Sequence, residues 1–139
     1  MDQALLVEPF LEDTQKLLHT FDADGKPVHF AAWCRDEESG QWKLWLASAY
    51  FDDKIRQDHS IKPSLLEIID TLKKAQVREL DLLNTKLVLT MHPVPKTLAK
   101  HYKVDETNSP LKTLGGRFDE YSFDIVIIMR LTLDTTKNG

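Results

Sequence analysis

Histidines and carboxylates are the residues of this sequence best suited to chemistry. His92 and His101 flank a proline-containing segment, and His29 lies in a predicted strand. An imidazole can act as a base or bind a metal near neutral pH. His92 and His101 are nine positions apart with no nearby cysteine, which is not a typical spacing of zinc ligands. We therefore interpret these two as surface residues, and His29 as a partly buried neighbour of aromatic side chains.

A second polar group follows the first two predicted strands. It combines carboxylates with an imidazole, in Asp52, Asp53, Asp58 and His59. Such a set could bind a divalent metal ion, but its spacing singles out no ligands, so a solvated loop is favoured. The sequence also lacks the HExxH, paired CxxC, GxSxG and glycine-rich phosphate-binding motifs. We predict no catalytic residue, no metal and no cofactor, and we favour a non-enzymatic protein over an enzyme.

Basic residues are concentrated in one region of an otherwise mixed sequence. The region contains Lys96, Lys100, His101, Lys103, Lys112 and Arg117. It could meet an anion or an acidic partner, although a solvated face that balances nearby acids is favoured. The whole chain has a net charge of -4, which disfavours binding to a phosphate backbone. Nucleic acid is therefore not an expected partner.

Size and composition indicate one globular domain. The 139 residues are 42% hydrophobic and 29% charged, so we expect a single domain over residues 1–139 with a frayed tail at 134–139. The longest apolar run, residues 125–129, is too short to span a membrane. The acidic start lacks the basic flank of a signal peptide, and the single cysteine, Cys34, fits a buried hydrophobic position. These features predict a cytoplasmic protein that does not enter a membrane.

Residues 27–48 are predicted to form a β-hairpin around which the other elements are arranged. Its polar link, residues 36–40, suits a loop of four or five residues. Alternation predicts that one side faces the core and carries Val28, Phe30, Ala32, Cys34, Trp42, Leu44 and Leu46.

The opposite side of the hairpin carries two tryptophans. Alternation places Trp33 there in the first strand and Trp45 in the second. If the register brings them together, the pair contributes about 0.2–1 kcal/mol relative to an alanine pair. With residues of the other strands they define a predicted interaction face, which consists of His29, Trp33, Lys43, Trp45, Val88, Val126, Ile128 and Arg130.

Hydrophobic periodicity predicts the remaining elements. Helices are expected at residues 10–21, from near Ile61 to Lys74 and at 96–103, and strands at 86–91 and 122–133 with a minor strand near 114–118. Residues 49–60 are predicted as a connection, and residues 76–84 fit either a helix or an irregular turn. The order α-β-β-α-β-α-β predicts an α+β two-layer sandwich. Helices are expected on one face of a mainly antiparallel sheet of four or five strands.

The predicted interaction face is the basis of the functional hypotheses. Its apolar patch could reach roughly several hundred Å², enough to require a cover. We therefore predict a homodimer or a complex with a protein partner. The alternative is a small-molecule-binding protein, or a minor enzyme, that uses the same face as a ligand platform. Stacking of single-stranded nucleic acid is the least favoured hypothesis, because the chain is acidic.

One segment carries a resemblance to known sequences. Residues 41–48, QWKLWLAS, followed by Asp52 and a helix that begins after Pro63, resemble the layout of small uncharacterised bacterial proteins. The closing strand at residues 125–131 adds to this similarity. The resemblance implies a bacterial source and transfers no activity and no functional residue.

Overall fold

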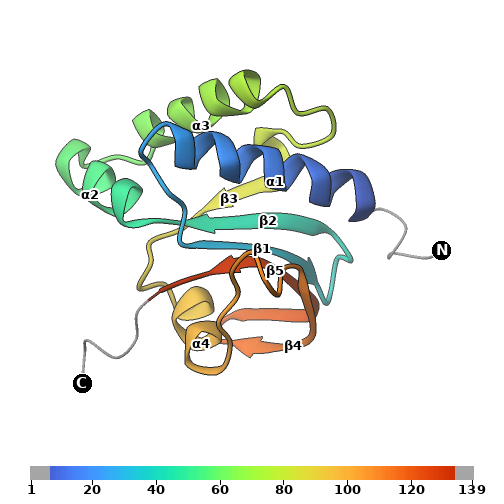
Figure 1. The fold of residues 1–139 in the computed structure, drawn as a ribbon. Coiled ribbons are helices and arrows are strands. Elements are labelled where there is room, and N and C mark those ends of the chain that lie inside the picture. The colour runs from blue at the N-terminus through green and yellow to red at the C-terminus, as the bar shows by residue number, and fades with distance from the viewer. Residues whose placement is uncertain (1–6, 134–139) are drawn as a thin grey trace.

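A five-stranded mixed sheet is the centre of an α+β fold in the computed structural model, which describes residues 7–133 (Figure 1). In chain order the elements are α1 (Val7–Ala23), β1 (Phe30–Asp36), β2 (Trp42–Ala47), α2 (Ala49–Asp58), α3 (Lys62–Ala75), η2 (Leu82–Asn84), β3 (Thr85–Leu87), α4 (Pro93–His101), β4 (Leu111–Phe118) and β5 (Tyr121–Leu131). The strand order is β3-β2-β1-β5-β4. Only the β2–β3 pair is parallel among the described strands, so the predicted α+β class with a mainly antiparallel sheet is confirmed. The tail predicted to fray, residues 134–139, lies outside the described residues.

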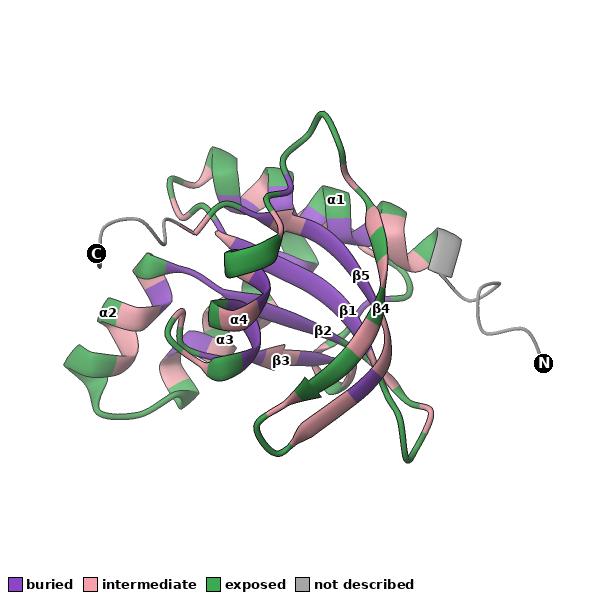
Figure 2. Cartoon of the chain, turned by 90° about the horizontal axis from the view of Figure 1, so that it is seen from below, coloured by how far each residue is buried: buried purple, intermediate pink, exposed green. Residues whose placement is uncertain are grey.

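Helices cover both faces of the sheet. α1 and α3 lie across one face, and α4 lies against the other (Figure 1). The first layer buries Leu17 and Phe21 of α1, and the second buries Val94 and Leu98 of α4. Figure 2 shows β1, β2 and much of β5 buried between these layers. The structure thus adds a third layer to the predicted sandwich, because β5 is apolar on both sides and needs two covers.

The two tryptophans of the predicted interaction face lie on opposite faces of the sheet. Trp33 is paired across the hairpin with Leu44 and belongs to the core under α1 and α3. Trp45 belongs to the core on the α4 side. The exposed fractions of Trp33 and Trp45 are 1% and 3%. The predicted cross-strand tryptophan pair, and the single face that contained it, are therefore wrong.

The length of the hairpin loop explains this error. The backbone N–H of Asp36 donates to the carbonyl of Gln41 at 2.9 Å, which leaves the four residues 37–40 in the loop. A loop of four residues pairs even-numbered positions of one strand with odd-numbered positions of the other, whereas five residues would pair even with even. Side chains of directly paired residues share a face, so Ala32 and Cys34 lie on the side of Trp45.

Helix α2 takes the place of the connection predicted at residues 49–60. Its N-cap is Ser48, whose hydroxyl accepts the backbone N–H of Phe51 at 3.2 Å. Asp52 in the first turn has the charge sign that favours a helix N-terminus. Phe51 is the one buried residue of this helix, so the apolar periodicity that would predict it is missing.

Three other elements differ in extent from their predicted bounds. β3 ends at Leu87 instead of residue 91, and Thr90 instead binds the carboxylate of Asp52. α4 begins at Pro93, three residues earlier than predicted, because the first turn of a helix needs no backbone donor from proline. β4 begins at Leu111, so the predicted minor strand is a full edge strand.

A buried carboxylate holds the segment at residues 76–84, most of which is irregular. Oδ2 of Asp13 in α1 accepts the backbone N–H groups of Arg78, Glu79 and Leu80 at 3.0, 2.6 and 3.1 Å. Asp13 is 4% exposed. A charged acceptor satisfies three donors that would otherwise be unpaired near the core. This contact ties α1 to the segment that leads into β3.

Replacing Asp13 with alanine should therefore lower the free energy of unfolding. We expect a loss of about 1–3 kcal/mol, because buried backbone donors lose their acceptor. Urea unfolding followed by circular dichroism measures the change. The matched control is Glu12→Ala, which removes an exposed acid of the same helix. Equal effects of the two substitutions would contradict the assigned role of Asp13.

Candidate functional site

Four residues of the predicted interaction face gather on the α4 side of the sheet. Trp45, Val88, Val126 and Ile128 belong to one buried core there. Their exposed fractions do not exceed 8%. This side of the sheet is thus covered by α4 and the β4–β5 hairpin, and the prediction that it is open is wrong.

Three other residues of the predicted face lie elsewhere. Trp33 is on the opposite side of the sheet. Arg130 binds the carboxylate of Asp22 in α1 with two nitrogens, each at 2.9 Å. His29 precedes β1 and bonds to neighbouring strands through its main chain. Lys43 is the remaining polar residue of the predicted face, and it lies beside Trp45.

Trp45 is the centre of an aromatic cluster. Its ring centroid lies 5.4 Å from His92, 5.1 Å from Tyr121 and 5.4 Å from Phe123, with interplanar angles of 71°, 88° and 81°. Such edge-to-face pairs contribute about 0.5–1.5 kcal/mol each beyond the burial of their area. The rings come from β2, β5 and the cap of α4, so the cluster joins three distant parts of the chain.

A pocket of about 270 Å³ opens beside this cluster. Strands β1, β2, β3 and β5 and the β1–β2 loop contribute to its lining, which consists of Cys34, Asp36, Ser39, Gln41, Lys43, Trp45, Lys86, Tyr121 and Phe123. Burial raises the pKa of the Cys34 thiol far above its ordinary value. Because a thiolate is the reactive form, Cys34 is an unreactive part of the pocket wall.

Two lysines bring positive charge to this pocket. Nζ of Lys86 lies 5.2 Å from the ring centroid of Trp45 and 5.6 Å from that of Tyr121, which is cation–π geometry. Lys43 lies two residues before Trp45 on β2, and therefore on the same face. Among the described side chains, no carboxylate forms an ion pair with either lysine.

His92 joins the cluster to the N-terminus of α4. Its Nδ1 accepts the backbone N–H of Val94 at 3.1 Å. Burial, and then the charge of Lys86, lower the pKa of His92 from 6.5, while Asp119 and Glu120 act in the opposite direction. The imidazole is therefore mostly neutral at pH 7, and its hydrogen bond positions α4 against the aromatic rings.

Of the residues that form this site, the predicted interaction face contained only Lys43 and Trp45, and among those that it missed are Lys86, His92 and Tyr121. Lys86 had a usable signal, because it shares the alternation of Val88, which was assigned to the correct side of the sheet. His92 and Tyr121 had none, since a turn and a hairpin bring them to Trp45 from distant parts of the chain.

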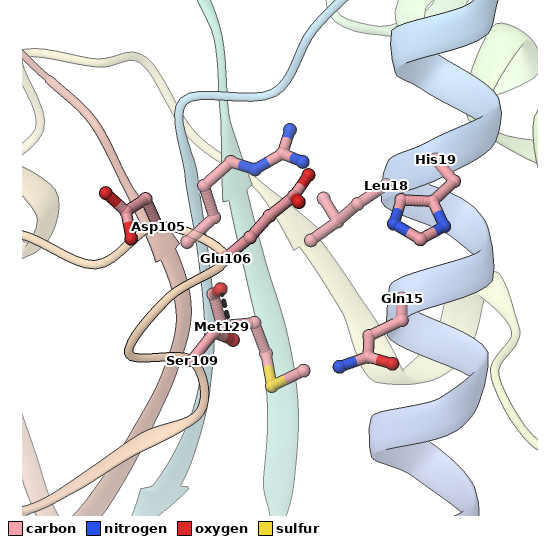
Figure 3. A pocket seen from close by; sticks show the side chains of 8 residues that line it. Gln15, Leu18, His19, Asp105, Glu106, Ser109 and Met129 are labelled. Carbon is pink, nitrogen blue, oxygen red and sulfur yellow. Dashed lines mark hydrogen bonds between the residues drawn. The ribbon is translucent and has the colours of Figure 1, made fainter.

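A second pocket, of about 210 Å³, lies between α1, the loop before β4 and β5 (Figure 3). Two of its polar side chains already have partners within the fold. The hydroxyl of Ser109 donates to the carbonyl of Met129 at 2.7 Å, and Arg130 is bound by Asp22. It is therefore the weaker candidate for a ligand site.

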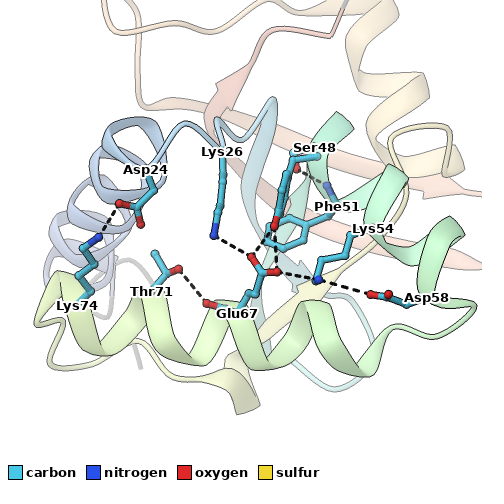
Figure 4. A network of polar contacts seen from close by, with 10 residues as sticks. Asp24, Lys26, Ser48, Phe51, Lys54, Asp58, Glu67, Thr71 and Lys74 are labelled. Carbon is cyan, nitrogen blue, oxygen red and sulfur yellow. Dashed lines mark hydrogen bonds and ion pairs between the residues drawn. The ribbon is translucent and has the colours of Figure 1, made fainter.

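Glu67 of α3 is the centre of an ion network (Figure 4). Its carboxylate accepts the hydroxyl of Tyr50 at 2.8 and 2.9 Å, and the ammonium groups of Lys26 and Lys54 each lie 3.0 Å away. Burial acts to raise the pKa of Glu67, but the bonds from Lys26, Lys54 and Tyr50 outweigh it and hold the pKa below 4.5. The network joins the α1–β1 loop to α2 and α3, which is a structural role.

Replacing Glu67 with glutamine should reduce stability at pH 7 by about 1–2 kcal/mol, allowing for solvent screening of partly exposed charges. A carboxylate with a lowered pKa stabilises the fold above its ordinary pKa of 4.5, and this contribution is lost as pH falls through the folded-state pKa. Urea unfolding of both proteins should show their difference shrinking below pH 4.5. Asp70→Asn, on an exposed position of α3, should show no such change. A difference independent of pH would contradict this role of the carboxylate charge.

The polar residues considered as a metal set do not converge. Asp53 pairs with Arg56 at 2.9 Å, and Asp58 pairs with Lys54 at 3.5 Å. Within residues 7–133, no group of three or more His, Cys, Asp or Glu side chains could hold a metal ion. No helix in the same part of the chain has the length and apolar character needed to cross a bilayer.

The chain matches no protein-family model, no curated protein and no solved structure. The resemblance to small bacterial proteins therefore stays a prediction.

Proposed function

We propose that the protein binds a small molecule in the pocket beside Trp45. The supporting observation is a concave site of about 270 Å³ where aromatic rings meet two lysines that lack an ion-pair partner among the described side chains. Ligand sites are typically concave and largely apolar, with a few polar groups that set orientation. Trp45 thus acts as the wall of a pocket instead of the open platform predicted from the sequence.

Binding without catalysis fits the lining of this pocket. The Cys34 thiol is held in its neutral form, and Nδ1 of the adjacent His92 already accepts a backbone bond. Covalent catalysis requires a nucleophile within hydrogen-bond reach of a base, and no hydrogen bond joins two of the described lining side chains. We retain as proposals the cytoplasmic location and bacterial source predicted from the sequence.

Ligand binding should move one tryptophan signal out of three. Trp33 and Trp42 pack with the opposite core, so their indole N–H resonances should stay in place while that of Trp45 shifts saturably. Two-dimensional NMR of the labelled protein, titrated with neutral and charged planar compounds, measures this. Single Trp→Phe variants assign the signals. A Trp45 signal that no compound shifts would contradict the proposal.

A second candidate function is self-association through the outer edge of β4. β4 ends the strand order and pairs with β5 alone among the described strands. Leu114, in the middle of β4, is 85% exposed. An exposed apolar residue on an unpaired edge favours addition of another strand. The homodimer predicted for the covered face is therefore proposed to form at this edge.

A two-fold register centred on Leu114 suits such a pairing. It places Leu114 against its own copy and Lys112 against Gly116, which keeps like charges apart. This register therefore places the exposed apolar residue of β4 at the centre of the contact.

Light scattering over a range of concentrations should show a mass twice that of the chain. Leu114→Lys should restore the monomer, because it puts two charges at the centre of the paired edges. The matched control is Leu83→Lys, since Leu83 is 86% exposed but lies in η2, outside the β4 edge. A wild-type monomer at all concentrations, or a dimer insensitive to Leu114→Lys, would overturn this candidate.

A further inference from the structure

We propose that the pocket beside Trp45 takes a planar organic anion, namely a ring that carries a carboxylate or a phosphate group. This inference depends on the proposed small-molecule binding and adds the charge and shape of the ligand. Its basis is the combination of aromatic walls with two ammonium groups in one pocket.

The negative charge of the ligand follows from the lysines. Lys86 pairs with Trp45 across the parallel β2–β3 ladder, and Lys43 is two residues from Trp45 along β2. The two ammonium groups therefore come from diagonal positions on adjacent strands of one face. The described side chains supply no carboxylate partner to either lysine. An anionic ligand would provide the partner, with charge-assisted hydrogen bonds.

The planar shape follows from the arrangement of the rings. Tyr121 and Phe123 are nearly parallel, at 17°, and both are nearly perpendicular to Trp45. The three aromatic side chains of the lining therefore present both ring edges and ring faces. A flat ligand can stack on one and meet the edge of another. A volume of about 270 Å³ limits the ligand to one or two rings.

Three carboxylates near the pocket repel an anion, but they do not outweigh the attraction of the two lysines. Oδ1 of Asp36 already accepts the backbone N–H groups of Glu38 and Ser39 at 2.7 and 3.3 Å. Asp119 and Glu120 are exposed in the β4–β5 turn, where water and salt screen their charges. The lysines therefore dominate inside the pocket, and added salt should weaken binding of the anion.

The test compares each anion with its neutral analogue by calorimetry on the wild-type protein. The probes are 4-hydroxybenzoate against 4-hydroxybenzamide for a carboxylate, and phenyl phosphate against phenol for a phosphate. One anion should bind at least tenfold more tightly than its neutral analogue. The pair that shows this difference in affinity identifies the anionic group of the ligand as a carboxylate or a phosphate.

Lysine variants then locate the charge recognition. Lys86→Gln and Lys43→Gln should each weaken binding of the preferred anion at least fivefold and leave the neutral analogue unchanged. Lys86→Arg keeps the charge and should retain most of the affinity, which separates lost charge from lost packing. Lys100→Gln is the control, because Lys100 is an exposed residue of α4 outside the pocket.

The outcomes separate this inference from the proposed function. If neutral analogues shift the Trp45 indole signal and bind as tightly as the anions, the pocket binds small molecules but does not recognise charge, and the inference is wrong. If no compound shifts that signal, small-molecule binding itself is wrong. Equal weakening of anion and neutral analogue by Lys86→Gln would show a packing role, which also overturns the inference.

Discussion

The register of the β1–β2 hairpin is the constraint on which the rest of this structure depends. The hydrogen bond from Asp36 to Gln41 closes the loop with four residues, and every side chain of β2 is thereby assigned to a face relative to β1. With one more loop residue, each side chain of β2 would face the other layer. Trp45 would then pack under α1 and α3, and no aromatic pocket would form on the α4 side.

Because both hairpin strands are apolar on both sides, the sheet needs two covers. α1 and α3 supply one, and α4 with the curled β4–β5 hairpin supplies the other. The second cover is the smaller, and it leaves the end of the sheet near the β1–β2 loop open beside Trp45. The pocket lies there, between residues of that loop and the rings of Trp45, Tyr121 and Phe123.

An element could be predicted from the sequence when the interactions that form it are local in the chain, and not when they join distant segments. Local periodicity was sufficient for α1, α3 and β5, whose buried stripes are regular. It failed for α2, which is held by a Ser48 cap and one buried ring. For the site, the sequence placed Trp45 and Lys43 on one side correctly. It could not bring Tyr121 and His92 to them, since those contacts depend on chain reversal far from β2.

The position of β1 in the middle of the sheet has a consequence for how the chain folds. One neighbour of β1 follows it immediately through a short loop, but its other neighbour, β5, is roughly 100 residues away at the pair Phe30–Leu131. A chain emerging from the ribosome can form the β1–β2 hairpin early, yet one edge of β1 has to wait for β5. Closing so long a loop is slow relative to local pairing. During that interval β1, an apolar strand, has one unpaired edge, so a chain in which β5 is not yet in place is prone to aggregation.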